Sequence, residues 1–172
     1  MATPYDVQTF LLDKVNIHDT ITRMMLGYDD RDSKSLRDKV YASNVLMDYS
    51  ALLGTEPTDY PVEDWLEYLF RATEGFDATQ HTAQDMLIEL PQPTNGATRP
   101  KTVAVAAYVN AHMVRRDARG GPMMHNGGRS YFELEHFQEI EDAGENPWRI
   151  RKMRVQPAWE DGNSAVLEGA KK

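Results

Sequence analysis

The sequence predicts an α+β domain in which a curved, mostly antiparallel sheet wraps one face around N-terminal helices. Two observations lead to this fold class. Apolar residues recur at helical spacing in roughly the first 75 positions. Strand-like runs then follow at His81–Leu90, Lys101–Arg116, Arg129–Ile140 and Trp148–Gln156. Helices followed by a run of antiparallel strands are typical of an α+β domain and disfavour a doubly wound sheet.

The helices and the first strand are expected in a definite order. A long amphipathic helix starts at Val7 and carries Tyr28 at the end of its buried stripe. Ser33 is suited to cap a short second helix, and Asn44–Tyr49 is typical of a brief strand. Pro61 suits the first turn of another helix, which we expect to cover the core.

The long strand has two faces that both look partly buried. One face carries Val103, Val105, Ala107, Val109, Ala111 and Met113, and the other carries Ala104, Ala106, Tyr108, Asn110, His112 and Val114. Successive side chains of a strand point to opposite sides of the sheet. We expect Tyr108, Asn110 and His112 to line a polar cavity, and the opposite face to contact a partner subunit.

Alternation leaves the facing of the last two strands open. Tyr131 and Glu133 face the cavity if the odd-numbered residues point inward, and Glu133 then lies beside His112. An exposed edge is an equally good interpretation, because a shift of one residue exchanges the two faces. In the last strand, Met153 and Val155 either line an apolar pocket or belong to the ordinary core.

Length, charge and composition limit the function classes. The chain has 172 residues, a net charge of −8 and no cysteine. We expect one domain over residues 1–160 with a polar tail at 161–172, and hairpin loops at 91–100 and 117–128. The acidic balance disfavours nucleic acid, and the absence of cysteine excludes disulfides and thiolate metal sites.

The N-terminal residues, the apolar runs and the histidine spacing predict a cytoplasmic protein without a metal site. The first residues lack a basic and apolar leader pattern, and no apolar run is long enough to cross a membrane. The remaining histidines, His18, His125 and His136, show no spacing that suggests metal ligation.

Four polar aromatic or imidazole side chains are expected to converge from four different elements. They are Tyr28, Tyr49, His81 and His112. A neutral polar group buried alone is costly, whereas several that face one another share hydrogen bonds and a substrate. Taken singly, each residue also has a purely structural interpretation. Tyr28 can end a helix with its hydroxyl in water, and Tyr49 can be an ordinary strand aromatic. His81 can stabilise a loop, and His112 can be a core histidine whose hydrogen bonds are all made.

Short segments spread over most of the chain carry a family resemblance. They are Gly27–Asp32, Leu36–Arg37, Val45–Tyr49, Thr79–His81, Ala106–His112 and Trp159–Asn163. The chain resembles the scytalone dehydratase family, within the SnoaL-like group of the cone-shaped, nuclear-transport-factor-like fold. The resemblance therefore implies a cone-shaped pocket between the sheet and the helices.

The resemblance also implies catalytic roles. Carried over position by position, the family's functional residues are Tyr28, Asp29, Tyr49, His81 and His112. It implies that Asp29 orients and charges His112, that the tyrosines polarise a carbonyl, and that His81 supports proton transfer. The family uses no metal or organic cofactor. Tyr131 and Glu133 stand where the family has a Ser and an Asn, so we expect a different substrate. The family's apolar C-terminal lid has no match in residues 161–172. We therefore expect a different element to close the pocket, such as the loop around Met123 and Met124.

Two function hypotheses follow. The first is a cofactor-independent lyase or isomerase that dehydrates, cyclises or rearranges a small cyclic carbonyl-bearing natural product, of the kind found in polyketide pathways. The second is a non-catalytic module that binds a small ligand or serves oligomerisation. A homodimer or homotrimer is expected in either case, because an apolar outer sheet face needs cover.

Overall fold

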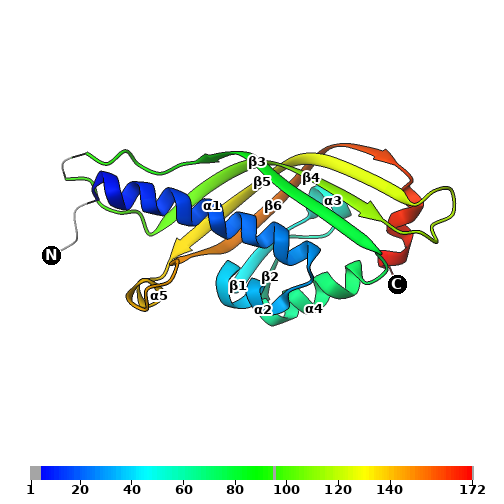
Figure 1. Ribbon diagram of the computed structural model, residues 1–172, viewed down its shortest axis with the longest axis horizontal. Helices are drawn as coiled ribbons and strands as arrows, with labels where there is room; N and C mark the ends of the chain where they lie inside the picture. The colour runs from blue at the N-terminus through cyan, green and yellow to red at the C-terminus, as the bar shows by residue number, and fades with distance from the viewer. Residues whose placement is uncertain (1–4, 95, 172) are drawn as a thin grey trace.

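The computed structural model describes residues 5–94 and 96–171. The elements along the chain are α1 (Val7–Asp29), α2 (Ser33–Ser35), the π-helical turn η1 (Leu36–Val40), β1 (Tyr41–Asp48), α3 (Ser50–Leu53), β2 (Thr58–Pro61), α4 (Val62–Thr73), β3 (Ala78–Ile88), β4 (Thr102–Val114), β5 (Met123–His136), α5 (Gln138–Asp142), β6 (Trp148–Gly162) and the 3-10 helix η2 (Ser164–Lys171). Figure 1 shows the helices of the first half packed beside a curved sheet, which confirms the α+β prediction.

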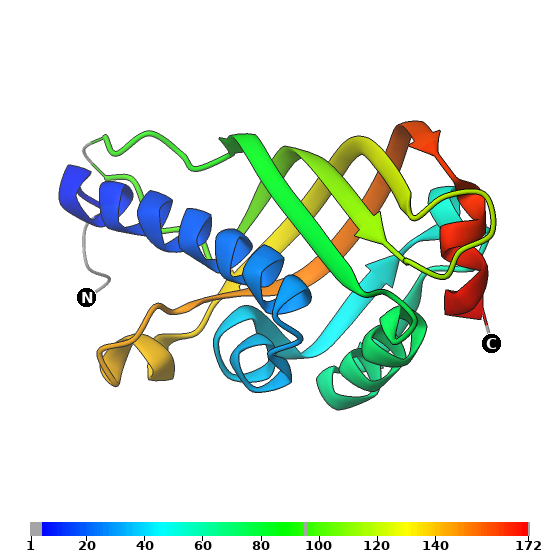
Figure 2. The same cartoon turned by 45° about the vertical axis from the view of Figure 1, so that its right-hand side comes forward.

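The six strands form one sheet in the order β2-β1-β6-β5-β4-β3. Strands β1 and β6 run parallel, and every other neighbouring pair in this order is antiparallel. Helix α1 crosses the concave side of the sheet next to β3, and α4 lies near β1 and β2 (Figure 2). The mostly antiparallel, curved sheet of the prediction is therefore confirmed, and β3 forms one of its edges.

Helix α1 follows the predicted periodicity. It begins after Asp6, whose carboxylate accepts a hydrogen bond from the Thr9 backbone N–H at 2.8 Å. Ile17, Ile21 and Met24 are fully buried on the face toward the sheet. Among the residues described, no helix has both the length and the apolar character needed to cross a membrane.

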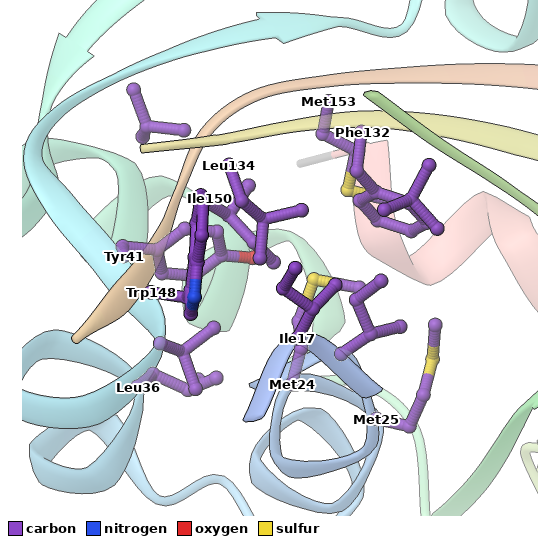
Figure 3. Close-up of a cluster of buried hydrophobic side chains, with 14 of the residues drawn as sticks. Ile17, Met24, Met25, Leu36, Tyr41, Phe132, Leu134, Trp148, Ile150 and Met153 are labelled. Carbon is purple, nitrogen blue, oxygen red and sulfur yellow. The ribbon is translucent and has the colours of Figure 1, made fainter. Parts of the chain in front are cut away.

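The core lies between α1 and the concave face of the sheet. Figure 3 shows Ile17 and Met24 of α1 opposite Leu134, Trp148 and Ile150 of the sheet. Trp148 is 0% exposed despite its size. Burying a large apolar side chain contributes roughly 1.5–3 kcal/mol to stability, so this cluster fixes the helix on the sheet.

The expected facing of β4 is wrong. Val103, Val105 and Ala107 point to the concave side and join the core, whereas Tyr108 is 54% exposed on the convex side. Branched side chains bury more apolar area than the alanines of the alternate face, so the helices cover the valine-rich face. These residues therefore give no reason to expect a partner subunit, and the homodimer or homotrimer stays a prediction.

The expected loop at 117–128 is shorter than its glycines suggested. Strand β5 begins at Met123, and its register shifts between Gly127 and Gly128. A Cβ on Gly128 would come within 2.2 Å of the Gln156 carbonyl oxygen of β6. The glycines therefore permit a bulge and a close strand approach that bend the sheet, rather than a flexible loop. The segment 91–100 is a connector as expected, with Asn95 outside the described residues.

A second small cluster lies at the other end of the sheet. Val166 of η2 is fully buried against Met113 and Met124, together with Phe76. Met124 is thus a strand residue in this cluster and not part of a loop over a pocket. The chain after Asp161 therefore packs on the domain at Val166. Lys172 lies outside the described residues.

A buried ion network ties three separate segments together. Asp13 of α1 is 0% exposed and binds the Arg99 guanidinium through both carboxylate oxygens. Arg99 also donates to both carboxylate oxygens of Glu141 at 2.8 Å, and the Trp148 indole N–H donates to Asp13 at 2.8 Å. The network joins α1, the connector between β3 and β4, and α5.

Candidate active site

A carboxylate and an imidazole form the centre of the site. The Asp29 carboxylate accepts a hydrogen bond from His81 Nδ1 at 2.7 Å. It also accepts from the His81 backbone N–H at 2.8 Å and from the Thr79 hydroxyl at 2.9 Å. The side chains of Asp29 and His81 are 18% and 22% exposed. Helix α1 and edge strand β3 thus present a partly enclosed acid–base pair.

The position of Asp29 is unfavourable by the rules of helix formation. It is the last residue of α1, where the helix dipole disfavours a negative charge. Burial on its own would raise the pKa of Asp29, but the hydrogen bonds from His81 and Thr79 outweigh burial and hold the pKa below its ordinary value. The carboxylate is therefore ionised at neutral pH.

The Asp29 carboxylate fixes the tautomer of His81. An ionised carboxylate only accepts hydrogen bonds, so Nδ1 of His81 must carry a proton. This leaves Nε2 as the basic nitrogen of a neutral imidazole. When Nε2 takes a proton, the nearby carboxylate stabilises the resulting imidazolium.

Three phenols gather beside this pair. The Tyr28 ring meets the His81 ring edge to face, with centroids 5.7 Å apart and an interplanar angle of 87°. The Tyr28 hydroxyl is hydrogen-bonded to the Tyr41 hydroxyl. Tyr49 stacks on Trp65 at 5.6 Å, and its hydroxyl is close enough to shift the pKa of Tyr28.

The phenols of Tyr28 and Tyr49 remain protonated donors. Burial raises the pKa of both hydroxyls well above 10. Both side chains nevertheless keep part of their surface accessible. The apolar Ala83 and Val109 are half-buried neighbours on the same concave face.

We expect the Asp29→Asn substitution to reduce the pH dependence of stability. A carboxylate with a lowered folded-state pKa stabilises the fold above its unfolded pKa, near 3.8, and loses that contribution as pH falls through the folded value. The loss caused by Asp29→Asn should therefore be larger at pH 7 than at pH 3 in urea unfolding. Asp30→Asn, next in the chain and exposed, is the control, and an equal loss at both pH values would contradict the assignment.

His112 does not reach this site. Across the strand ladder His112 pairs with Gln80, and His81 pairs with Ala111. Directly paired residues of neighbouring strands project on the same side, so His112 lies on the convex face, opposite to His81. Its ring lies 5.4 Å from that of His125 on the same face. The expected pair between Asp29 and His112 is therefore wrong, and Asp29 pairs with His81.

Four expected substrate-binding residues also lie away from the site. Tyr108 and Asn110 follow His112 to the convex side of β4. Tyr131 and Glu133 pair with Ala106 and Ala104 of that side, so of the two facings left open for them the inward one is wrong. The Arg154 guanidinium lies 4.5 Å from the centre of the Tyr131 ring. The even-numbered Phe132 and Leu134 fill the core instead, because apolar side chains take the covered face of β5.

Met153 and Val155 do point to the concave side. Met153 is buried in the core, and Val155 packs against the core while staying half-buried. The structure thus brings together Tyr28, Asp29, Tyr49 and His81 of the expected catalytic set, with Val155 on the same face of the sheet. Their roles in catalysis stay predictions.

Sequence reasoning missed Tyr41 and Trp65. Tyr41 begins β1, three residues before the expected start of that strand, and Trp65 is a buried residue of α4. Two surface hollows, of about 590 Å³ and 330 Å³, lie elsewhere. The first is between η1 and α4, around Arg37 and Glu67, and the second is between α1 and β3, around Val15 and Met86.

Comparison with known proteins agrees with the fold and extends it to a family. A family model described as the SnoaL-like domain matches residues 9–154. No curated protein matches the chain at a significant level. The Kfla4162 protein from Kribbella flavida has a similar structure, with a TM-score of 0.76 and 17% identity over 93% of this chain and 97% of that chain.

Two further solved structures share the fold. A provisionally named scytalone dehydratase from Novosphingobium aromaticivorans has a TM-score of 0.69 and 13% identity, over 91% of each chain. A hexachlorocyclohexane dehydrochlorinase has a TM-score of 0.65 and 13% identity, over 90% of each chain. At such identities these likenesses show the fold alone. The match of the family model over most of the sequence places this chain in the SnoaL-like domain family, with the cone-shaped, nuclear-transport-factor-like fold.

Proposed function

We propose that the protein is a cofactor-independent lyase or isomerase that removes a proton from carbon next to a carbonyl in a small cyclic natural product. The observation that carries this proposal is the contact of 2.7 Å between Asp29 and His81 Nδ1, which leaves Nε2 as a base beside the Tyr28 phenol. A base and hydrogen-bond donors are the two parts that carbon-acid chemistry requires.

The reaction starts with transfer of the carbon-bound proton to His81 Nε2. The electrons of the broken C–H bond move toward the carbonyl, whose oxygen becomes an enolate. The Tyr28 and Tyr49 hydroxyls donate hydrogen bonds to that oxygen, and Asp29 stabilises the imidazolium. In an elimination the enolate electrons re-form the carbonyl and make a C=C bond as the C–O bond on the next carbon breaks, and the His81 proton goes to that oxygen, which leaves as water. In an isomerisation the proton goes to a different carbon.

The names of two structural relatives are compatible with this class of reaction. One is provisionally named a dehydratase and the other a dehydrochlorinase, and both names denote eliminations. Membership of the SnoaL-like domain family is also compatible with this class of reaction. The phenols and the half-buried apolar side chains near them support the proposed substrate class, a neutral ring with one carbonyl.

Exchange of α-protons for deuterium in a panel of ring ketones, including 2-tetralone, tests the proposal without knowledge of the natural substrate. We expect the protein to accelerate exchange in D₂O, followed by NMR. Tyr28→Phe should lower the rate by about 10²-fold, because removing one donor to a developing oxyanion typically costs about 10²- to 10³-fold in rate.

Tyr108→Phe is the matched control for that experiment, because it removes a phenol hydroxyl from the convex face of β4. Its exchange rate should equal that of the unmodified protein. Equal losses in both variants would contradict the proposed role of Tyr28. Tight binding of a ketone without any exchange would instead identify a ligand-binding module.

A further inference from the structure

Tyr41 contacts the proposed active site from inside the core. It is 2% exposed, and Figure 3 shows its ring among the core side chains beside Ile150 and Trp148. A buried phenol hydroxyl needs an acceptor for its proton. Among the described residues, the hydrogen-bond partner of the Tyr41 hydroxyl is the Tyr28 hydroxyl.

Trp65 lies near the same two hydroxyl oxygens. Its indole N–H is buried and has no partner with hydrogen-bond geometry among the described residues. Burial raises the pKa values of Tyr28 and Tyr41, and the Trp65 N–H offsets part of that rise for both, which places it near the two oxygens. An indole N–H only donates, so Trp65 cannot accept the Tyr41 proton.

The direction of the hydroxyls follows from these contacts. Because Trp65 is a donor only, the Tyr28 oxygen is the acceptor within hydrogen-bond reach of the Tyr41 hydroxyl among the described residues. Tyr28 then cannot donate its own proton back to Tyr41. Its O–H can then point toward the remaining neighbours, which are Tyr49 and the side on which the His81 ring lies.

We infer that Tyr41 is a positioning residue, which donates to the Tyr28 oxygen and so aims the Tyr28 O–H at a substrate oxygen bound beside His81. The inference rests on the proposed function, because the oxygen that Tyr28 binds is the carbonyl oxygen of the substrate. Tyr41 itself does not touch the substrate. Tyr41 affects the reaction only by orienting the Tyr28 hydroxyl. Removing the Tyr28 hydroxyl should therefore abolish the effect of Tyr41, which would not be so if Tyr41 had a merely structural role.

A double-mutant cycle tests the inference. Tyr41→Phe keeps the ring in the core and removes the hydroxyl, and it should lower ketone exchange by about tenfold, the equivalent of one hydrogen bond. In the Tyr28→Phe background the same change should lower exchange by less than about twofold, because its target is gone. Tyr60→Phe, in the neighbouring aromatic stack but outside the hydroxyl cluster, should leave the rate unchanged.

Binding of 4-nitrophenol gives a second measurement that needs no turnover. Its absorbance near 400 nm reports the ionised form, so titration gives both affinity and the pKa of the bound phenol. When Tyr28 is present, Tyr41→Phe should weaken binding of the nitrophenolate about tenfold. In the Tyr28→Phe background the same substitution should have little effect on binding.

The two measurements separate the possible failures. If no ketone undergoes exchange but Tyr41→Phe still weakens nitrophenolate binding only when Tyr28 is present, the proposed function fails and the positioning role stands. If ketone exchange occurs but the two substitutions act independently in both assays, the positioning role is overturned and the proposed function stands. Lack of nitrophenolate binding by the unmodified protein would also overturn the positioning role.

Discussion

Replacing His81 with alanine is expected to lower the rate of ketone exchange by about 10²- to 10⁴-fold, the usual contribution of a general base. His81 supplies the only basic group that the Asp29 carboxylate contacts among the described residues, and Nε2 is the atom left to accept a proton. In this variant Asp29 has no imidazolium to stabilise. The rate in D₂O, measured by NMR, is the direct test.

His112→Ala is the matched control, because it removes the same group from the opposite face of the sheet. We expect its exchange rate to remain within about twofold of the unmodified protein. Added imidazole should restore part of the activity of the His81→Ala variant, since the lost base is small and diffusible. A large loss in His112→Ala with normal activity in His81→Ala would return the catalytic role to the histidine that sequence resemblance favoured.

Arg99→Ala is expected to lower the free energy of unfolding by roughly 3–5 kcal/mol, the typical cost of breaking a buried ion pair by removing one partner. The substitution removes both guanidinium donors from Asp13, which is 0% exposed and keeps the Trp148 N–H as a donor. It also releases Glu141 of α5. The connector between β3 and β4 loses its anchor on α1.

Urea unfolding at pH 7, followed by circular dichroism, measures this loss. Lys34→Ala removes the exposed ion pair with Asp38, whose atoms are 2.7 Å apart, and should cost at most about 1 kcal/mol. The double variant Asp13→Asn, Arg99→Ala should be more stable than Arg99→Ala alone, because no uncompensated charge stays buried. A cost for Arg99→Ala equal to that of Lys34→Ala would show that the network contributes little.

Half of the site could be predicted because it lies where local patterns are strong. The helical spacing that buries Ile17, Ile21 and Met24 also carries the chain to Tyr28 and Asp29 at the end of α1. A stop in helical periodicity fixes where these side chains emerge. His81 lies near the start of β3, as the strand-like run that begins at His81 predicts, but its approach to Asp29 at the end of α1 is a tertiary contact over 52 positions.

The prediction was wrong about which side of the sheet His112 and its neighbours on β4 face. In β4 the two alternating sets are both rich in small or apolar residues, so period-two alternation gives no preference between them. The helices cover the set with Val103 and Val105, and His112 follows the other set to the convex side. The choice between His81 and His112 as partner of Asp29 is therefore made by which face α1 covers.

The sequence by itself determined the order of helices and strands, because hydrophobic periodicity and capping residues act over a few neighbouring positions. It also placed Tyr28, Asp29, Tyr49 and His81 at the ends or starts of those elements. Only the tertiary structure decided that Asp29 binds His81, that Tyr41 reaches Tyr28 from the core, and that Arg99 joins Asp13 across 86 positions. Those contacts depend on register and on the packing of α1 against the sheet, which no local pattern encodes.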